Sequence, residues 1–254
     1  MFQEERHNLI LKQLEAEGKV LVRDLAEQFS VTEDSIRKDL AALEAAGKLK
    51  RTYGGALSLE EKALMTKAHQ RRLSDVDAKR RIASAVYNLL KPAQLIYLDC
   101  SSISIAVGDL ILAANAELKI LTNMIELAFM LARNPKVELY LLGGRINQSR
   151  DAFSDTLALD ALSHFKPDIS FIGASGVDFI SNTVTTYSPS DGVYKGRLID
   201  SSKEAYVMAE ARKIGIVANY AFAEAKRLTG LITDTDLSAA QRKAAGDVKV
   251  VGSW

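Results

Sequence analysis

TEDSIRKDLAALEAAGKLKRTYGG, residues 32–55, is the stretch that determines how the first part of the chain folds. Its apolar residues recur at the spacing of one helical face: Ile36, Leu40 and Leu43. Thr32 is a suitable N-cap for this helix, and Gly47 is a suitable end. Residues 48–53 alternate like a short strand, and Gly54-Gly55 permits a sharp turn. A helix followed by a basic hairpin is typical of a recognition helix and its wing.

Two shorter helices are predicted upstream of this stretch. One carries Ile10 and Leu14 on its apolar face, and the other carries Leu25 and Phe29. Three helices and a hairpin over 1–58 predict a winged helix-turn-helix, a fold that places one helix in the major groove of DNA.

The positive charge of this region is local. The whole chain has a formal net charge of only +1, whereas residues 37–53 hold five Lys and Arg against two Asp and Glu, a net of +3. We expect the DNA-contacting residues to be Thr32, Ser35, Arg37, Lys38, Lys48, Lys50, Arg51 and Tyr53. The alternative is a solvated basic face that contacts no nucleic acid.

Composition excludes several classes of protein. The chain has 254 residues, 48% of them hydrophobic, and one cysteine, so an intramolecular disulfide framework is excluded. The three histidines, His7, His69 and His164, are too scattered to predict a metal site, and no cofactor is expected. No secretory signal or membrane-spanning run is visible. A cytoplasmic protein without a membrane partner is the expectation.

The remainder of the chain predicts a second domain. We expect a linker over 59–75 and an α/β domain over 76–254 that serves sensing and oligomerisation. Short apolar strand candidates alternate there with helical stretches: 95–98, 119–121, 137–142, 169–172, 206–208, 231–232 and 248–251. This alternation predicts βα units on a largely parallel, Rossmann-like sheet.

Polar residues follow several of these strands. In parallel sheets, ligands bind beyond the carboxyl ends of the strands, often with a phosphate at a helix N-terminus. The expected effector-binding residues are Asp99, Ser101, Ser102, Ser104, Thr122, Asn123, Gly143, Gly144, Arg145, Lys195, Glu210 and Lys213. Each also has a structural interpretation: serines as helix caps, glycines as turn residues and lysines as surface charges. Cys100 is expected to be a buried residue and not a nucleophile.

The chain resembles the DeoR family of bacterial transcriptional regulators from end to end. The resemblance lies in ERHNLIL, SVTEDSIRKDLAALEAAGKL and RTYGGA in the first domain, and in YLDCSSIS, LTN, LLGGR, FIGASGVD and VTT in the second. It implies a sensor domain similar in fold to ribose-5-phosphate isomerase. It also implies a small phosphorylated sugar or related molecule as effector, bound without turnover.

The sequence departs from the family pattern at several positions. Ser35 stands where threonine is usual, and Leu21 stands where the second helix is often capped by Ser or Thr. Ser101-Ser102-Ile103 replaces Gly-Thr-Thr, Asp155 replaces a glycine, and residues 210–215 replace Asp-Ser-Ser-Lys-Phe-Gly. An added carboxylate near the pocket is expected to weaken phosphate binding.

These observations predict a DNA-binding regulator, a repressor of a carbohydrate or nucleoside utilisation operon. Its partners would be a double-stranded operator, a phosphorylated sugar and further copies of itself as a dimer or tetramer, because one module makes a small interface. Two alternatives stay open: a sugar-phosphate isomerase or deaminase with an appended DNA-binding domain, and a regulator whose effector pocket has degenerated.

Overall fold

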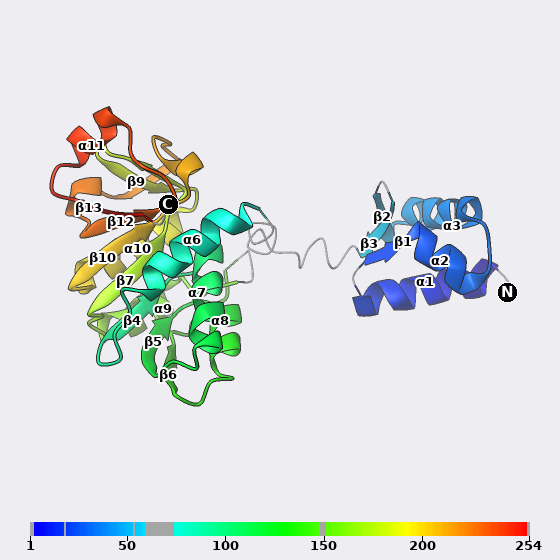
Figure 1. The fold of residues 1–254 in the computed structure, drawn as a ribbon. Helices are drawn as coiled ribbons and strands as arrows, with labels where there is room; N and C mark the ends of the chain where they lie inside the picture. The colour runs from blue at the N-terminus through cyan, green and yellow to red at the C-terminus, as the bar shows by residue number, and fades with distance from the viewer. Residues whose placement is uncertain (1–2, 18, 53, 59–73, 148–150, 253–254) are drawn as a thin grey trace. The chain divides into compact units, whose positions relative to one another are not determined.

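The computed structural model divides the chain into two compact units, Met1–Thr66 and Lys67–Trp254 (Figure 1). It describes residues 3–17, 19–52, 54–58, 74–147 and 151–252. Most of the linker expected over 59–75 lies outside these residues, so its limits and those of the two domains remain expectations. Each unit is described by itself below.

The N-terminal unit is a winged helix-turn-helix. Its elements are α1 (Gln3–Glu17), β1 (Lys19–Leu21), α2 (Val22–Phe29), α3 (Glu33–Ala45), β2 (Leu49–Thr52) and β3 (Gly55–Ser58). The strands form an antiparallel sheet in the order β1-β3-β2, so β2 and β3 are the predicted wing. The core contains the predicted apolar faces of all three helices, including Ile10, Leu14, Leu25, Ile36, Leu40 and Leu43.

Individual residues determine where the helices begin and where the hairpin turns in this unit. Thr32 caps α3 by accepting a hydrogen bond from the Ser35 backbone N–H at 3.2 Å, as predicted. Leu21 precedes α2 and supplies no side-chain cap. Gly55 lies so close to β1 that a Cβ there would meet the carbonyl oxygen of Val20. The hairpin therefore needs glycine at this position.

A buried carboxylate connects α1 to α3. Asp39 accepts from Arg6 Nε at 2.5 Å and from Arg6 Nη2 at 3.1 Å, and its Oδ1 lies 3.0 Å from His7 Nε2. Burial by itself raises the pKa of Asp39, but hydrogen bonds from Arg6 and His7 outweigh burial and lower it. Asp39 is therefore an internal charge that positions α3 against α1 and is not part of the outer surface of α3.

We expect Asp39→Ala to destabilise the N-terminal unit by about 3 kcal/mol, because the substitution leaves Arg6 without its buried partner. Hydrogen exchange of the slowest α3 amides in the intact chain measures this loss. Asp34→Ala is the control: Asp34 pairs with Arg37 on the exposed surface, where a pair contributes less than about 1 kcal/mol. Equal losses in the two variants would contradict the structural role of Asp39.

The second unit contains a seven-stranded parallel sheet. Its strands are β4 (Leu95–Leu98), β5 (Leu118–Thr122), β6 (Val137–Leu141), β7 (Ile169–Gly173), β10 (Glu204–Met208), β12 (Gly230–Thr233) and β13 (Lys249–Gly252). The order is β13-β12-β10-β7-β4-β5-β6. Every neighbouring pair is parallel, which confirms the predicted α/β class.

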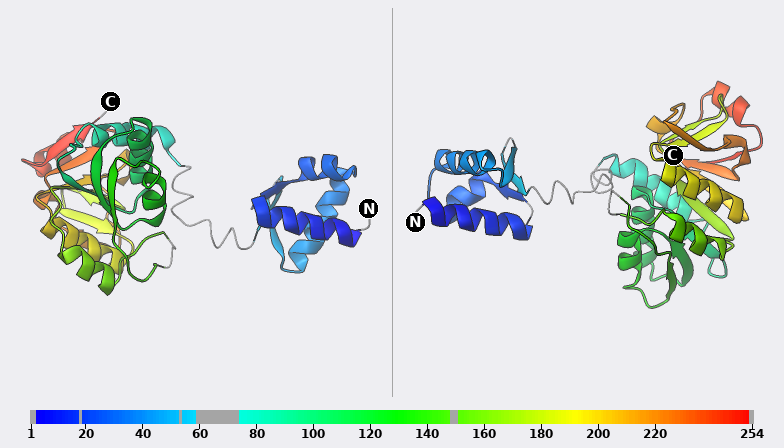
Figure 2. Two further views of the ribbon diagram at one scale, coloured as in Figure 1. Left: turned by 90° about the horizontal axis from the view of Figure 1, so that it is seen from below. Right: turned by 180° about the vertical axis from the view of Figure 1, so that it is seen from behind.

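Helices cover both faces of the sheet (Figures 1 and 2). On one face lie α6 (Val76–Tyr87), α7 (Ser102–Ala113) and α8 (Ile125–Leu131), and on the other lie α9 (Thr156–Ser163), α10 (Pro189–Ser201) and α11 (Ala239–Ala245). Alternate strand residues enter the two cores: Ile96 and Leu98 pack toward α6–α8, and Tyr97 packs toward α9–α11. The sheet is thus buried on both sides, as its continuous apolar strands require.

A small antiparallel sheet was not predicted. It consists of β8 (Gly176–Asp178), β9 (Thr183–Thr186) and β11 (Tyr220–Ala223), in the order β11-β9-β8. The strand predicted over 169–172 is β7, and no strand was predicted over 176–178 or 183–186. The sheet packs beside α10 and carries Thr186 to the edge of the site described next.

Candidate functional site

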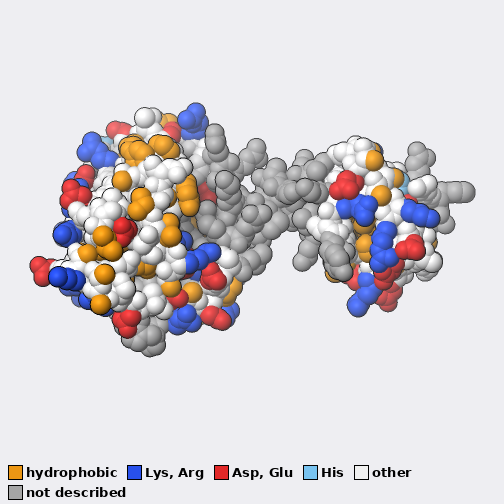
Figure 3. All heavy atoms as spheres, turned by 90° about the horizontal axis from the view of Figure 1, so that it is seen from above, with side chains coloured by type: hydrophobic (Ala, Val, Ile, Leu, Met, Phe, Trp, Pro, Cys, Tyr) orange, Lys and Arg blue, Asp and Glu red, His pale blue; other side chains and the backbone are white. Residues whose placement is uncertain are grey.

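The outer face of α3 and the wing present basic side chains. Arg37 and Lys38 on α3, Lys48 before β2 and Arg51 on β2 are exposed. Figure 3 shows Lys and Arg side chains interspersed with Asp and Glu on one face of this unit. The Lys50 side chain and the whole of Tyr53, which were also predicted to contact DNA, lie outside the described residues.

Two polar side chains of α3, those of Arg37 and Ser35, contact neighbouring side chains. Arg37 pairs with Glu33 at 2.6 Å and with Asp34 at 2.9 Å. The hydroxyls of Thr32 and Ser35 lie 3.0 Å apart. These pairs are exposed, so a DNA phosphate can replace either carboxylate at little cost.

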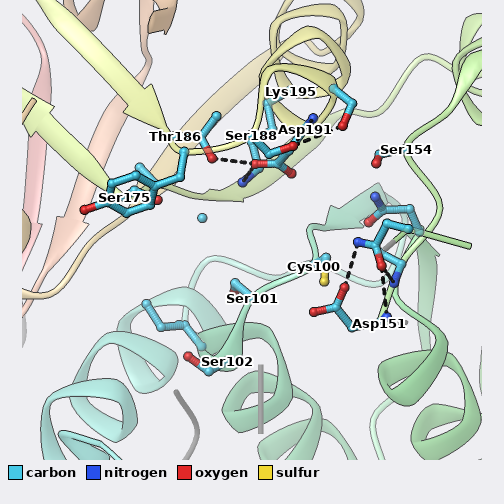
Figure 4. Close-up of a pocket in the computed structure, with 18 of the residues that line it drawn as sticks. Cys100, Ser101, Ser102, Asp151, Ser154, Ser175, Thr186, Ser188, Asp191 and Lys195 are labelled. Carbon is cyan, nitrogen blue, oxygen red and sulfur yellow. Dashed lines mark hydrogen bonds and ion pairs between the residues drawn. The ribbon is translucent and has the colours of Figure 1, made fainter. Parts of the chain in front are cut away.

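The second unit contains a cavity of about 800 Å³ at the carboxyl edge of its large sheet (Figure 4). Residues that follow β4, β5, β6, β7 and β10 line it. The order of the sheet reverses between β4 and β7, since β5 and β6 extend from one side and β10, β12 and β13 from the other. Such a reversal separates the crossover helices and is where parallel sheets bind ligands.

The N-terminus of α7 forms one wall of the cavity. Ser101 is the N-cap of α7 and accepts from Ser104 N–H at 3.0 Å, while Ser104 Oγ donates to Asp99 O at 2.6 Å. Ser101 and Ser104 therefore have structural roles. Ser102 lies on the first turn and lines the cavity. Helix N-termini favour anions, which makes this wall suitable for a negatively charged group.

Lys195 forms the opposite wall, between two carboxylates. Its Nζ lies 2.8 Å from Asp191 and 3.4 Å from Asp99. Burial lowers the pKa of Lys195, but the charges of Asp191 and Asp99 outweigh burial and raise it, so the ammonium stays charged. Thr186 Oγ1 donates to Asp191 at 2.8 Å and so holds the Asp191 carboxylate in place (Figure 4).

Lys213 lines the cavity beside a second buried carboxylate. Its Nζ lies 2.6 Å from Glu210 Oε2, and the Glu210 side chain is only 3% exposed. Burial by itself raises the pKa of Glu210, yet the charge of Lys213 and hydrogen bonds from Lys213 and Lys79 lower it to about 2. Glu210 is therefore ionised at neutral pH and lies behind the cavity wall.

The structure brings together half of the predicted effector residues. The cavity is lined by Ser101, Ser102, Asn123, Arg145, Lys195 and Lys213. The others are not among its lining residues: Asp99, Ser104, Thr122, Gly143, Gly144 and Glu210. Thr122 Oγ1 donates to Leu98 O at 2.7 Å and links two strands. Gly143 and Gly144 form the turn that precedes Arg145.

Several lining residues were not predicted: Asp151, Ser154, Thr186, Ser188 and Asp191. Asp155, the added carboxylate expected near the pocket, also lines the cavity. One of the unpredicted residues had a signal in the sequence, because Asp191 and Lys195 are four residues apart on a helix that begins with Ser188-Pro189. Cys100 also lines the cavity, and burial raises the pKa of its thiol well above the ordinary value.

Family comparisons identify both units. A model of the DeoR-like helix-turn-helix domain matches residues 6–69, and a model of the DeoR C-terminal sensor domain matches residues 74–235. The chain belongs to the DeoR family. It is a DNA-binding transcriptional regulator.

The DeoR relatives match along most of their length. FruR of Bacillus subtilis, an uncharacterized HTH-type transcriptional regulator, is 30% identical over 93% of each chain. The glycerol-3-phosphate regulon repressor of Escherichia coli is 27% identical over 85% of this chain and 84% of its own. The lactose phosphotransferase system repressor of Lactococcus lactis is 25% identical over 84% of each.

Solved structures overlap a smaller part of this DeoR-family chain. Ribose 5-phosphate isomerase A of Methanocaldococcus jannaschii covers 56% of it at 16% identity and a TM-score of 0.41. The eIF2B delta structure from Chaetomium thermophilum covers 70% at 14% identity and a TM-score of 0.46.

Asp155, which departs from the DeoR pattern, is bound to the protein backbone. It caps α9 by accepting from Ala158 N–H at 3.1 Å. Desolvation raises the pKa of Asp155, but backbone hydrogen bonds from Ala158 and Arg145 lower it overall. A Cβ on Gly144 would meet Asp155 Oδ1, so the turn before Arg145 closes around this carboxylate. The N-terminus of α9 thus already holds an anion supplied by the chain.

Within the described residues, no three His, Cys, Asp or Glu side chains are grouped so that they could hold a metal ion. Nor is any helix in that part of the chain both long and apolar enough to cross a membrane.

The pKa of Glu210 predicts the acid sensitivity of the sensor unit. Because the folded pKa of about 2 lies below the ordinary 4.5, Glu210 stabilises the fold above pH 4.5 and loses this effect as pH falls toward 2. We expect Glu210→Gln to lower the free energy of unfolding by about 3 kcal/mol at pH 7, with a smaller difference at pH 3.

Urea unfolding followed by circular dichroism at pH 7, 4.5 and 3 measures this difference. Glu138→Gln is the matched control, because Glu138 pairs with Lys119 on the exposed surface. A difference for Glu210→Gln that is the same at all three pH values would show that its carboxylate charge is not what stabilises the unit.

Proposed function

We propose that this DeoR-family regulator represses a carbohydrate or nucleoside utilisation operon and that a small phosphorylated sugar releases it from DNA. The cavity at the carboxyl edge of the sheet is the observation that carries the proposal. Hydroxyls, a helix N-terminus and the ammonium group of Lys213 line it, which suits a polyol bearing a phosphate. The names of the glycerol-3-phosphate regulon repressor and the lactose phosphotransferase system repressor support the same class of role.

In this proposal, the operator is bound by α3 and the wing. Arg37 and Lys38 lie on the exposed face of α3, with Ser35 near its start, and contact base edges or phosphates. Lys48, Lys50, Arg51 and Tyr53 contact the neighbouring backbone. One such module buries too little surface for operator-level selectivity, so two or more chains act together on repeated half-sites.

We expect Arg37→Ala and Lys38→Ala each to weaken operator binding at least about tenfold. Each substitution should also reduce the slope of log affinity against log salt by about 1 if the lost contact is to a phosphate. Fluorescence anisotropy with an operator selected from random DNA, titrated at several salt concentrations, measures affinity, slope and the number of chains bound.

Lys12→Ala is the matched control, since Lys12 is an exposed cation on α1 of the same unit. Its affinity and salt slope should equal those of the unaltered chain. Unchanged binding by Arg37→Ala and Lys38→Ala would reject α3 as the recognition helix, and one chain per operator would reject the oligomer.

The phosphate of the effector is proposed to lie between the first turn of α7 and Lys213. Asp155 already occupies the N-terminus of α9 and the backbone of Arg145, so the phosphate is not placed there. The sugar hydroxyls would then extend toward Asn123, Asp191 and Thr186. No proton-transfer role is assigned to these groups, and the effector is bound without turnover.

We expect a matching sugar phosphate at about 100 times its Kd to stabilise the sensor unit by about 2.7 kcal/mol, while the unphosphorylated sugar does not. Lys213→Met should weaken this binding at least about tenfold, because it removes the ammonium from the proposed phosphate position. Thermal-shift titrations with a panel of phosphorylated and free sugars and polyols measure both effects.

Lys203→Met is the control, because Lys203 is an exposed lysine that pairs with Asp168. A panel that shifts nothing would favour a degenerate pocket. Steady isomerisation of a sugar phosphate by the intact chain, abolished by Lys213→Met, would favour the enzyme alternative.

A further inference from the structure

Glu210 lies at the centre of three cations in the sensor unit. It follows β10 and precedes a short 3-10 helix over Ala211–Lys213. Its carboxylate lies 2.6 Å from Lys213 Nζ, 3.2 Å from Lys79 Nζ and 3.4 Å from Arg212 Nη2. Because the Glu210 side chain is only 3% exposed, water screens these interactions weakly.

One of the three cations belongs to the cavity. Lys213 is among the lining residues, and its side chain is 24% exposed. An anionic group that enters the cavity beside α7 therefore competes with Glu210 for the ammonium. Glu210 then depends more strongly on its two remaining cations.

Those two cations hold the beginning of the sensor unit. Lys79 Nζ donates to the Ser74 carbonyl oxygen. Arg212 Nε lies 3.0 Å from Asp75 Oδ2, and its Nη2 lies 3.4 Å from Ser74 Oγ. The match to the DeoR C-terminal sensor domain begins at residue 74, so this contact lies at the N-terminal end of that domain.

The backbone at Asp75 is held in an unfavourable conformation. Asp75 has φ 47°, in the left-handed region, and stands at the N-cap of α6 without capping it through its side chain. The Asp75 carbonyl accepts from Lys79 N–H at 3.1 Å and closes the first turn of α6. A conformation of this kind persists only while its surroundings hold it.

We propose that the Glu210 cluster (Glu210 with Lys79, Arg212 and Lys213) transmits effector binding from the cavity to Ser74–Asp75. When an anion draws Lys213 away, Arg212 shifts from Asp75 toward Glu210, and the first turn of α6 loosens. The cavity and the start of the sensor unit thus share one buried carboxylate, which gives the effector different interactions in the two states, as coupling requires. This inference rests on the proposed function, since it assigns the route by which that function is regulated.

The test removes the ammonium of Lys213 directly and needs no ligand. In intact Lys213→Met, hydrogen exchange of the amides of residues 79–82, the first that are hydrogen-bonded within α6, should be at least about tenfold faster than in the unaltered chain. Arg212→Gln cuts the contacts to Ser74 and Asp75 and should accelerate exchange over the same residues. Two matched controls should leave it unchanged: Arg80→Gln, an exposed arginine on the same helix that pairs with Asp77, and Lys203→Met.

The outcome separates this inference from the proposed function. Unchanged exchange over 79–82 in both Lys213→Met and Arg212→Gln would overturn the transmission route, even if sugar phosphates bind and release DNA. Faster exchange in both, matched by faster exchange of the unaltered chain with a sugar phosphate that stabilises it, would support the route. Faster exchange in the controls as well would also overturn it, because α6 would then loosen after any loss of charge.

Discussion

The parallel arrangement of seven strands is the constraint on which the sensor site depends. All carboxyl ends meet at one edge, so residues distant in sequence, such as Ser102, Asn123, Arg145 and Lys213, line the same cavity. The reversal of strand order beside β4 opens space there, because successive crossover helices turn to opposite faces. Chain connectivity therefore determines where a ligand binds before any particular side chain determines which ligand it is.

Internal ion pairs decide which cations are available to a ligand. Arg37 pairs with Glu33 and Asp34 on the exposed surface, where such a pair contributes little, so it can turn readily to a phosphate. Lys195 is held by two carboxylates at the edge of the cavity and is only 7% exposed, so separating it leaves buried charges without partners. Lys213, at 24% exposed, is intermediate. A ligand can thus recruit Lys213 at moderate cost, whereas Lys195 serves to fix Asp191.

The architecture was predictable from the sequence because local patterns report it. Apolar runs predicted β4, β5 and β7. The alternation of strands with helices predicted a parallel sheet. The small sheet was missed because β9 reads TVTT and β8 is three residues long, so neither has a distinct apolar pattern.

The site could be predicted only in part, because contacts between residues distant in sequence leave no local pattern. Residues immediately after strands could be expected to converge, but Asp151 reaches the cavity from the segment between β6 and α9, and Thr186 reaches it from β9 of the small sheet. Asp39 had been counted with the charges of the recognition helix, and its partner Arg6 lies 33 residues away, which no local pattern reveals. The departure at Asp155 was visible in the sequence, whereas its hydrogen bonds to Ala158 and Arg145 required the fold. A net charge of +1 adds little long-range attraction to DNA, so operator affinity must come mainly from direct local contacts. A switch that weakens those direct contacts therefore acts on nearly all of the operator-binding free energy.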